Sequence, residues 1–369
     1  MSLRLLVLLV ACAIAVLAVA ALAVVLTRPD GAPPGAIPPA ARPGTIPIAV
    51  LGDSNSHSYQ DRVSFTSSSP DRGGALRERT FQWTEVLARL RGNELDFGPW
   101  MVWGRPWWSA LAREYAGLLP SRSPIKEDYL YNFANSGATC RNLMGDGRGF
   151  RFRQVPRLVA LMNEQPERWK NGVVTIYIGA NDWNVYLELM SRDPEAPDLR
   201  RVIDDCTQEI GDAIAAIHAS HPSVRILLSG LINEADDPEQ LEKYRDATAT
   251  ANIHKALAGI NAAFRRIAEA DPKRIAFFDA DAWFVQRWGQ RGADGRPDFK
   301  TVRIGTLDVT NTQGDEPSNA VLADDHAGLA WNAMWAQSVV ARLHEAFGLP
   351  LTPITDEEVA RFVEATIKP

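Results

Sequence analysis

The chain has 369 residues, a formal net charge of −6, 46% hydrophobic residues and 23% charged residues. This is the composition of a globular protein, and the lack of a basic excess argues against nucleic acid as a partner. The part that can fold, from about residue 46 to the C-terminus, is long for one domain, but not for an α/β domain with insertions.

The N-terminus departs from globular composition. Residues 5–26 form an uncharged run of about 22 residues, long enough to cross a bilayer as a helix and longer than the apolar part of most signal peptides. Arg4 and Arg28 flank the run, so the distribution of positive charge does not decide its orientation. We expect residues 1–26 to be a transmembrane signal anchor with the rest of the chain outside the cytoplasm.

Two other interpretations of this segment stay open. Cleavage after an Ala-x-Ala site within residues 18–23 would release a secreted or periplasmic protein. The sequence LVAC, ending at Cys12, resembles a lipoprotein signal, but the apolar run continues well beyond it. Residues 27–45, TRPDGAPPGAIPPAARPGT, are rich in Pro, Gly and Ala, a composition typical of an extended linker.

The cysteines allow a disulfide without requiring one. Of the three, Cys12 lies in the apolar run, which leaves Cys140 and Cys206 for the folded part. Outside the cytoplasm these two can pair. The alternative is that Cys206 is simply a core residue, because it lies on an apolar stripe with helical spacing over residues 199–217.

Five short apolar runs predict buried strands. They cover residues 46–51, 129–133, 173–178, 224–228 and 275–278. Segments with helical spacing separate them, and such an alternation favours a parallel sheet covered by helices on both faces. A last amphipathic helix is expected over residues 331–347.

Two polar stretches interrupt this alternation. Residues 64–79 are rich in Ser, Gly and Arg, and residues 287–318 contain a possible hairpin at 302–309. We interpret both as insertions over the edge of the sheet, where functional residues often lie.

Polar residues follow the predicted strands and precede the last helix. They are Asp53 and Ser54 after the first run, Asn135 and Gly137 after the second, Gly179, Asn181 and Asp182 after the third, and Asp324, Asp325 and His326 before the helix. Ligands of open parallel sheets bind beyond the carboxyl ends of the strands, so these residues are candidates for one site.

The residue types are those that acyl transfer requires. A serine hydroxyl becomes a nucleophile when a histidine oriented by a carboxylate removes its proton. Ser54, at an expected strand-to-helix turn, would point its hydroxyl into the cleft. The backbone N–H groups of Ser54 and Gly137 and the side-chain amide of Asn181 would surround an oxyanion, with Gly137 allowing close approach of its backbone.

The motifs GDSN, a glycine in a polar loop, GAND and a late Asp-His pair, in this order, resemble the blocks of the SGNH (GDSL-like) hydrolase superfamily. The resemblance implies a flavodoxin-like three-layer α/β/α sandwich with a five-stranded parallel sheet over residues 46–369. It also implies ester hydrolysis by a Ser-His-Asp triad without metal or organic cofactor. By position Ser54 is the nucleophile, His326 the base, and Gly137 and Asn181 join Ser54 in the oxyanion hole.

One departure from the family pattern concerns the carboxylate. The last block of the family is Asp-x-x-His, but residue 323 is Ala, and the available carboxylates are Asp324 and Asp325. A loop shortened by one residue would give the role to Asp324, whereas Asp325, adjacent to His326, is expected to point away. A Ser-His dyad is the third alternative.

Two further features are singled out. His57 is too close to Ser54 in sequence to reach its hydroxyl well, so we expect a supporting or substrate-facing histidine. The stretch WMVWGRPWW, residues 100–108, holds four of the 11 tryptophans. It fits core packing or a lid, a platform for sugar rings, or a contact with the bilayer, and the sequence does not separate these.

The sequence therefore predicts a serine ester hydrolase, of esterase, lipase or deacetylase type, that acts on an acyl ester of a small molecule, glycan or lipid outside the cytoplasm. Its contact with the membrane is the N-terminal helix. The alternatives are an acyltransferase acting on envelope glycans and a non-catalytic binding module that keeps the fold.

Overall fold

The computed structural model describes residues 44–117, 122–145, 153–292 and 294–368, together with Val16, Val19 and Ala23. Apart from these three residues, Gly44 and Thr45, the predicted anchor and linker lie outside the described residues. Among the helices of the described part, none combines the length and the apolar character that crossing a membrane requires.

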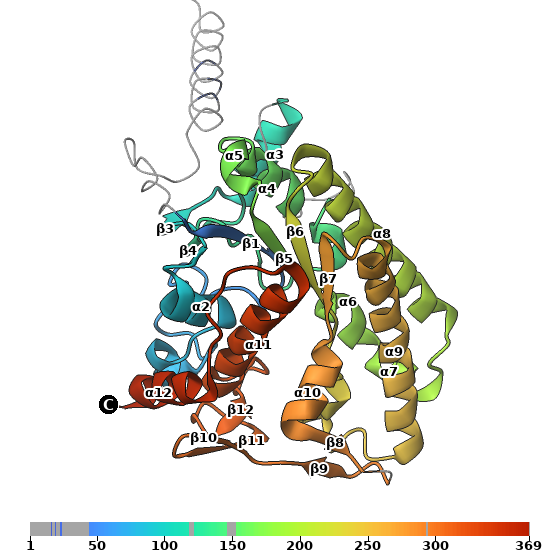
Figure 1. Ribbon diagram of the computed structural model, residues 1–369. Coiled ribbons are helices and arrows are strands. Elements are labelled where there is room, and N and C mark those ends of the chain that lie inside the picture. Colours follow the sequence, from blue (N-terminus) through green and yellow to red (C-terminus); the bar gives the residue numbers. More distant parts are fainter. Residues whose placement is uncertain are drawn as a thin grey trace, which may run out of the picture.

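A parallel sheet of five strands forms the centre of the molecule (Figure 1). Its spatial order is β2-β1-β5-β6-β7, and neighbouring strands are parallel. The strands are β1 (Ile46–Gly52), β2 (Leu95–Asp96), β5 (Val173–Tyr177), β6 (Arg225–Ser229) and β7 (Ile275–Phe278). This is the 2-1-3-4-5 order of flavodoxin-like folds, as expected. The central strands are apolar runs because both faces of the sheet are covered.

The predicted strand over residues 129–133 is wrong. The chain turns within this run, because the Asn132 N–H bonds back to the Tyr129 carbonyl at 3.0 Å. Tyr129 instead ends β4 (Lys126–Tyr129), which pairs antiparallel with β3 (Trp100–Trp103). Asn132 forms only an isolated parallel bridge with Val50. The segment therefore lies beside the later part of β1, on the same edge where β2 pairs with Ile46 and Pro47 at its start.

Helices cover both faces of the sheet (Figure 1). On one side α11 packs against α2 and α12, and on the other α8 packs against α4 and α9. The bounds are α2 (Trp83–Arg91), α4 (Gln154–Met162), α8 (Pro197–Ser220), α9 (Ala247–Ala270), α11 (Leu329–Phe347) and α12 (Asp356–Ile367). The result is the three-layer arrangement that the alternation of strands and helices predicts.

Shorter elements complete the fold. The helices are η1 (Gly74–Arg79), α3 (Trp107–Tyr115), η2 (Cys140–Asn142), α5 (Pro166–Trp169), α6 (Ala180–Trp183), η3 (Asn184–Tyr186), α7 (Leu187–Arg192), η4 (Glu234–Asp236), η5 (Pro238–Gln240) and α10 (Ala280–Trp288). The strands are β8 (Gly289–Arg291), β9 (Pro297–Phe299), β10 (Val302–Ile304), β11 (Leu307–Gln313) and β12 (Asn319–Val321). The expected hairpin is present as β10 and β11, with Val302 opposite Val309.

Cys140 and Cys206 form a disulfide across 66 residues of sequence, with their Cα atoms 5.2 Å apart. The bridge joins η2 to α8. Both cysteines are also buried in the core, so the two interpretations of Cys206 hold together.

The tryptophan-rich stretch divides between core and surface. Trp103 is buried and meets Phe133 edge to face, with ring centroids 5.6 Å apart. Trp107 and Trp108, at the start of α3, are 50% and 48% exposed. Core packing therefore accounts for Trp103 and not for the two exposed tryptophans of α3.

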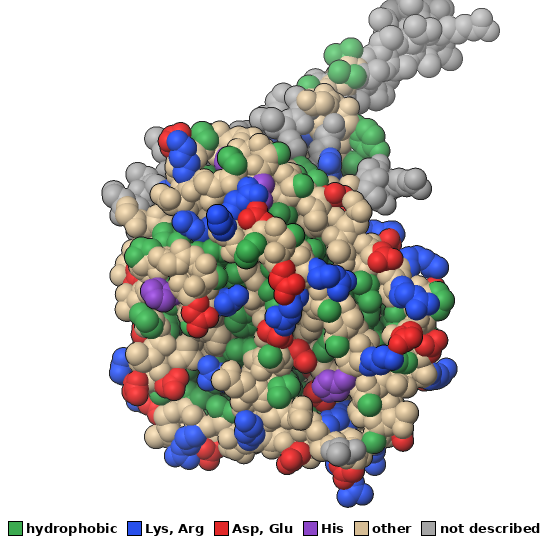
Figure 2. All heavy atoms as spheres, turned by 45° about the vertical axis from the view of Figure 1, so that its right-hand side comes forward, with side chains coloured by type: hydrophobic (Ala, Val, Ile, Leu, Met, Phe, Trp, Pro, Cys, Tyr) green, Lys and Arg blue, Asp and Glu red, His purple; other side chains and the backbone are tan. Residues whose placement is uncertain are grey.

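The surface mixes charges of both signs. On the face shown in Figure 2, basic and acidic side chains are interspersed, with hydrophobic side chains between them. This face carries no large field of a single sign.

Candidate active site

One cavity at the carboxyl end of the sheet brings together four of the predicted site residues. Ser54, Asn181, Asp324 and His326 line it, and its volume is about 430 Å³. Ser54 follows β1, Asn181 lies in α6 directly after β5, and the other two precede α11. Parallel strands end at the same edge of a sheet, which is why segments so distant in sequence meet here. This cavity is called the cleft below.

Ser54 lies in a tight turn at the end of β1. Asp53 builds the turn, because its carbonyl accepts from the Ser56 N–H (3.2 Å) and its Oδ1 from the Asn55 N–H (2.9 Å). The expected strand-to-helix turn is wrong, since the next described helix starts only at Gly74, after most of the first insertion. The Ser54 hydroxyl makes no hydrogen bond with the described residues, which leaves it available to a base.

His326 presents one ring nitrogen to Asp324. Its Nδ1 lies 2.7 Å from the Asp324 carbonyl oxygen and 3.4 Å from Oδ1 of the same residue. Its Nε2 makes no hydrogen bond with the described residues. A general base of this kind needs such an arrangement, with one nitrogen oriented by an acceptor and the other open to the nucleophile.

Asp324, rather than Asp325, lies beside the imidazole. Asp325 adopts a positive φ of 63°, and its Oδ1 accepts from the Gln313 side chain. Burial opposes ionisation of Asp324, but the hydrogen bond and charge of His326 and the charge of Arg72 outweigh it and hold the pKa of this carboxyl well below its usual value. The geometry favours Asp324, whose role as the orienting carboxylate stays a prediction.

Arg72 is the residue at this site that the sequence analysis missed. It comes from the insertion 64–79 and is 4% exposed. Its backbone N–H donates to Oδ2 of Asp324 at 2.9 Å, and its Nη1 donates to the same oxygen. Nη1 also lies 2.8 Å from Nδ1 of His326. With Oδ2 held in this way, Oδ1 of Asp324 lies 3.4 Å from Nδ1 of His326 and has no hydrogen-bond partner among the described residues. The position of the insertion was the only signal in the sequence, because nothing distinguishes this arginine from its neighbours.

A second buried network supports Arg72 from behind. Its Nη2 donates to the Ser136 hydroxyl at 3.2 Å, and the Ser136 backbone N–H donates to Nδ1 of His57 at 3.1 Å. Nε2 of His57 therefore carries the proton and donates to Asp61 at 2.8 Å. Burial, and then the charge of Lys126, lower the pKa of His57 to about 4. His57 is thus a neutral, buried histidine that does not line the cleft.

The two remaining oxyanion candidates differ in placement. Gly137 does not line the cleft, and a Cβ at this position would meet no atom within 4 Å. Its φ of 75° rather than close approach explains the glycine. The Asn181 amide donates to the Ala138 carbonyl at 2.8 Å, which ties it to the Gly137 loop. An amide nitrogen carries two hydrogens, so one remains for an oxyanion.

Among the described residues one group, Cys140, Asp182 and Cys206, has the spacing of metal ligands. The two sulfur atoms are joined to each other and offer no thiolate. Asp182 accepts from the Cys140 N–H at 2.8 Å, so the group holds η2 in place.

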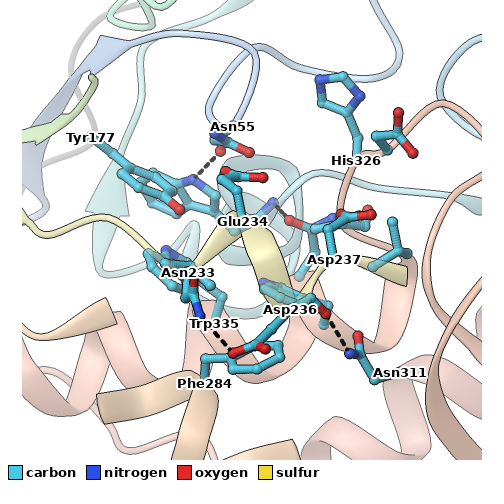
Figure 3. Close-up of a pocket in the computed structure, with 17 residues that line it drawn as sticks. Asn55, Tyr177, Asn233, Glu234, Asp236, Asp237, Phe284, Asn311, His326 and Trp335 are labelled. Carbon is cyan, nitrogen blue, oxygen red and sulfur yellow. Dashed lines mark hydrogen bonds between the residues drawn. The ribbon is translucent and has the colours of Figure 1, made fainter. Parts of the chain in front are cut away.

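A smaller pocket adjoins the cleft (Figure 3). The two cavities share Asn55, Glu234, Asp237, Asp325 and His326 in their linings. Aromatic side chains, among them those of Tyr177 and Trp335, form part of the rest of its wall. This second cavity is called the inner pocket below.

Comparisons with known proteins point to one family. The model of the family described as GDSL-like Lipase/Acylhydrolase matches residues 48–298. The comparison with curated proteins yields no match.

Solved structures with some likeness include three esterases. An extracellular lipase from Streptomyces rimosus is 16% identical, with 69% of this chain and 86% of that chain covered and a TM-score of 0.35. A catalytic mutant of an acetylxylan esterase from Geobacillus stearothermophilus is 13% identical, with coverages of 82% and 96% and a TM-score of 0.37. A phospholipase A1 from Streptomyces albidoflavus is 13% identical, with coverages of 73% and 91% and a TM-score of 0.36. Likeness at this level does not extend to substrate or mechanism.

Proposed function

Because the chain belongs to the GDSL-like lipase/acylhydrolase family and is an ester hydrolase, we propose that Ser54 is its nucleophile and His326 its base. Asp324 orients the histidine, and the cleft is the active site. One observation carries the proposal. Ser54 and His326 line the same cavity, and neither the Ser54 hydroxyl nor Nε2 of His326 is hydrogen-bonded to a described residue, while Asp324 lies at Nδ1 of the imidazole.

In the reaction, Nε2 of His326 takes the proton of the Ser54 hydroxyl as Oγ attacks the ester carbonyl. The backbone N–H of Ser54 and the side-chain amide of Asn181, two residues that line the cleft, stabilise the oxyanion. The imidazolium then gives its proton to the leaving alcohol, and an acyl-serine remains. Water, deprotonated by the same histidine, releases the acid and restores Ser54.

We assign this activity to the outside of the cytoplasmic membrane, with the chain held by a transmembrane helix within residues 1–26. The apolar run 5–26 supports the anchor, and the disulfide supports an oxidising compartment. In this location the substrates within reach are acyl esters of envelope glycans and lipids.

A fluorophosphonate probe tests the nucleophile, because it labels only an activated serine. The full-length wild type should be labelled, and Ser54→Ala and His326→Ala should lose both labelling and esterase turnover. Ser56→Ala is a matched control in the same turn, since its hydroxyl only accepts from the Trp83 indole at 3.2 Å, and it should keep its label. Labelling and turnover that persist in Ser54→Ala would overturn the assignment.

A further inference from the structure

Three carboxylates stand between the cleft and the inner pocket. Glu234, Asp237 and Asp325 line both cavities. No ion pair joins any of them to a described Lys, Arg or His. By contrast Asp236, also in the wall, is paired with Arg291 at 2.9 Å. Three carboxyl groups therefore face one small space without an ion-pair partner among the described residues.

The lining of the inner pocket offers no cation to balance them. None of the described residues that line it is Lys or Arg, and its only titratable base is His326. Lys243 lines the cleft but not the inner pocket. The mixed surface seen in Figure 2 differs in this respect, so the single sign of the pocket is not a general property of the molecule.

The carboxylates resist ionisation together. Burial, and then the charges of neighbouring carboxylates, raise the pKa of Glu234 and of Asp237 to about 7. The pKa of Asp325 is raised to about 7 as well, by burial first and then by Glu239 and other acids. A bound cation would relieve this repulsion directly.

The amide side chains of the pocket also leave an acceptor, rather than a donor, without a partner. The amide nitrogen of Asn311 donates to the Asp236 carbonyl, and that of Asn332 to two backbone carbonyls (Figure 3 shows the first of these bonds). The Asn311 Oδ1 has no partner, although the side chain is 5% exposed. Buried acceptors are nearly always paired, so this oxygen calls for a ligand that donates.

Aromatic rings complete the wall. Tyr177 and Trp335 are stacked with centroids 5.0 Å apart, and the half-buried Trp331 also lines the pocket. The faces and π-systems of such rings attract cations. The volume of the pocket, about 60 Å³, is several times what one water requires and suits a small group.

We propose that the inner pocket receives an ammonium group, so that the preferred substrates are esters carrying a positive charge a few bonds from the carbonyl. The inference rests on the proposed function, because the pocket adjoins the ester only if His326 is the base. A neutral polyhydroxyl group would donate to Asn311 but leave the carboxylates uncompensated, and an anionic group would be repelled.

Matched ester pairs test the proposal on the full-length chain in detergent. One pair places the charge in the alcohol, 2-(dimethylamino)ethyl acetate against 3-methylbutyl acetate. The other places it in the acyl group, ethyl 4-aminobutanoate against ethyl pentanoate. The members of each pair have nearly the same shape. The kcat/KM of the cationic member should exceed that of its neutral partner about tenfold or more in at least one pair.

Charge-neutralising variants locate the effect. Glu234→Gln and Asp237→Asn should each move the cationic-to-neutral ratio towards one, whatever they do to absolute rates. Glu167→Gln removes the same charge from an exposed residue of α5, paired only with Lys170, and should leave the ratio unchanged. A ratio near one in both pairs, or a preference that Glu234→Gln and Asp237→Asn leave intact, would overturn the proposal.

Binding separates this inference from the proposed function. In Ser54→Ala, calorimetry should show tighter binding of 5-(dimethylamino)pentan-2-one than of 6-methylheptan-2-one, which are ketone counterparts of the first ester pair. Cation preference in binding without turnover of any ester by the wild type would support the pocket and refute the hydrolase site. Turnover of the cationic and the neutral esters, without a cation preference in kinetics or in binding, would support the hydrolase site and refute the ammonium pocket.

Discussion

At the scale of single residues, the adjacent carboxylates Asp324 and Asp325 offer the most direct test of the site. Asp324→Asn should lower kcat/KM by about four orders of magnitude, because an amide at this position favours the wrong tautomer of His326. Asp325→Asn should cost far less, since its carboxylate accepts from Gln313 instead. Steady-state kinetics of the two variants decides. A larger loss of kcat/KM in Asp325→Asn would show that Asp325, one residue later, is the orienting carboxylate. Small losses in both variants would indicate a Ser-His dyad.

Arg72 is expected to position the triad without touching the substrate. Arg72→Ala should lower kcat about a hundredfold with little change in KM, because Asp324 loses the guanidinium that holds Oδ2 and a small misplacement is costly. Arg72→Lys should recover part of the loss, since the charge returns without the fork that also reaches Ser136.

Arg77→Ala is the matched control for Arg72, because this arginine of the same insertion donates only to the carbonyls of Phe65 and Thr66. A rise in KM with unchanged kcat in Arg72→Ala would show that Arg72 binds substrate instead.

His57 predicts a pH-dependent contribution to stability. Its pKa is about 4 in the folded protein and 6.5 ordinarily, so the unfolded state binds more protons between these values and stability is lost as the pH falls through this window. From about pH 7.5 to about pH 5, this group alone should cost the wild type about 2 kcal/mol. Urea unfolding should show that the destabilisation caused by His57→Gln shrinks by this amount at the lower pH. A constant difference between the two proteins would contradict a neutral, buried His57.

At the scale of elements, the disulfide ties η2, just after the Gly137 loop, to α8. Closing a loop of 66 residues is worth up to about 4 kcal/mol through the entropy of the unfolded chain. Cys206→Ser should lower the free energy of unfolding towards this limit, as should reduction of the wild type. Denaturant curves with and without reductant measure both. Thiol labelling of the denatured, unreduced chain should modify neither Cys140 nor Cys206, and modification of both would exclude the bridge.

At the scale of the whole molecule, the N-terminal segment should determine location but not catalysis. The full-length chain should fractionate with membranes, and removal of the first 45 or so residues should release a soluble, active protein, because the described core begins with β1 at Ile46. Fractionation followed by an esterase assay checks both. A mature N-terminus located after residue 20 would replace the anchor with a cleaved signal.

Local signals in the sequence were sufficient for most of the sheet and for part of the site. Apolar runs identified β1, β5, β6 and β7, because a strand buried on both faces must be apolar throughout. They failed at residues 129–133. This run is as apolar as the true strands, but the hydrogen bond from the Asn132 N–H to the Tyr129 carbonyl closes a turn within it. Burial explains why the run is apolar, and it does not distinguish a strand from a buried turn.

The sequence by itself determined the family, the parallel sheet, the places of Ser54 and Asn181 after their strands and that of His326 before the last helix, because motifs and periodicity are properties of neighbouring residues. Only the tertiary structure decided that Arg72 donates hydrogen bonds to Asp324 and that Cys140 forms a disulfide with Cys206. The same holds for the pocket that Glu234, Asp237 and Asp325 share. These contacts join segments up to 252 residues apart. The strength of these contacts depends on the distance between the groups and on how deeply they are buried, and neither can be read from a local pattern of residues.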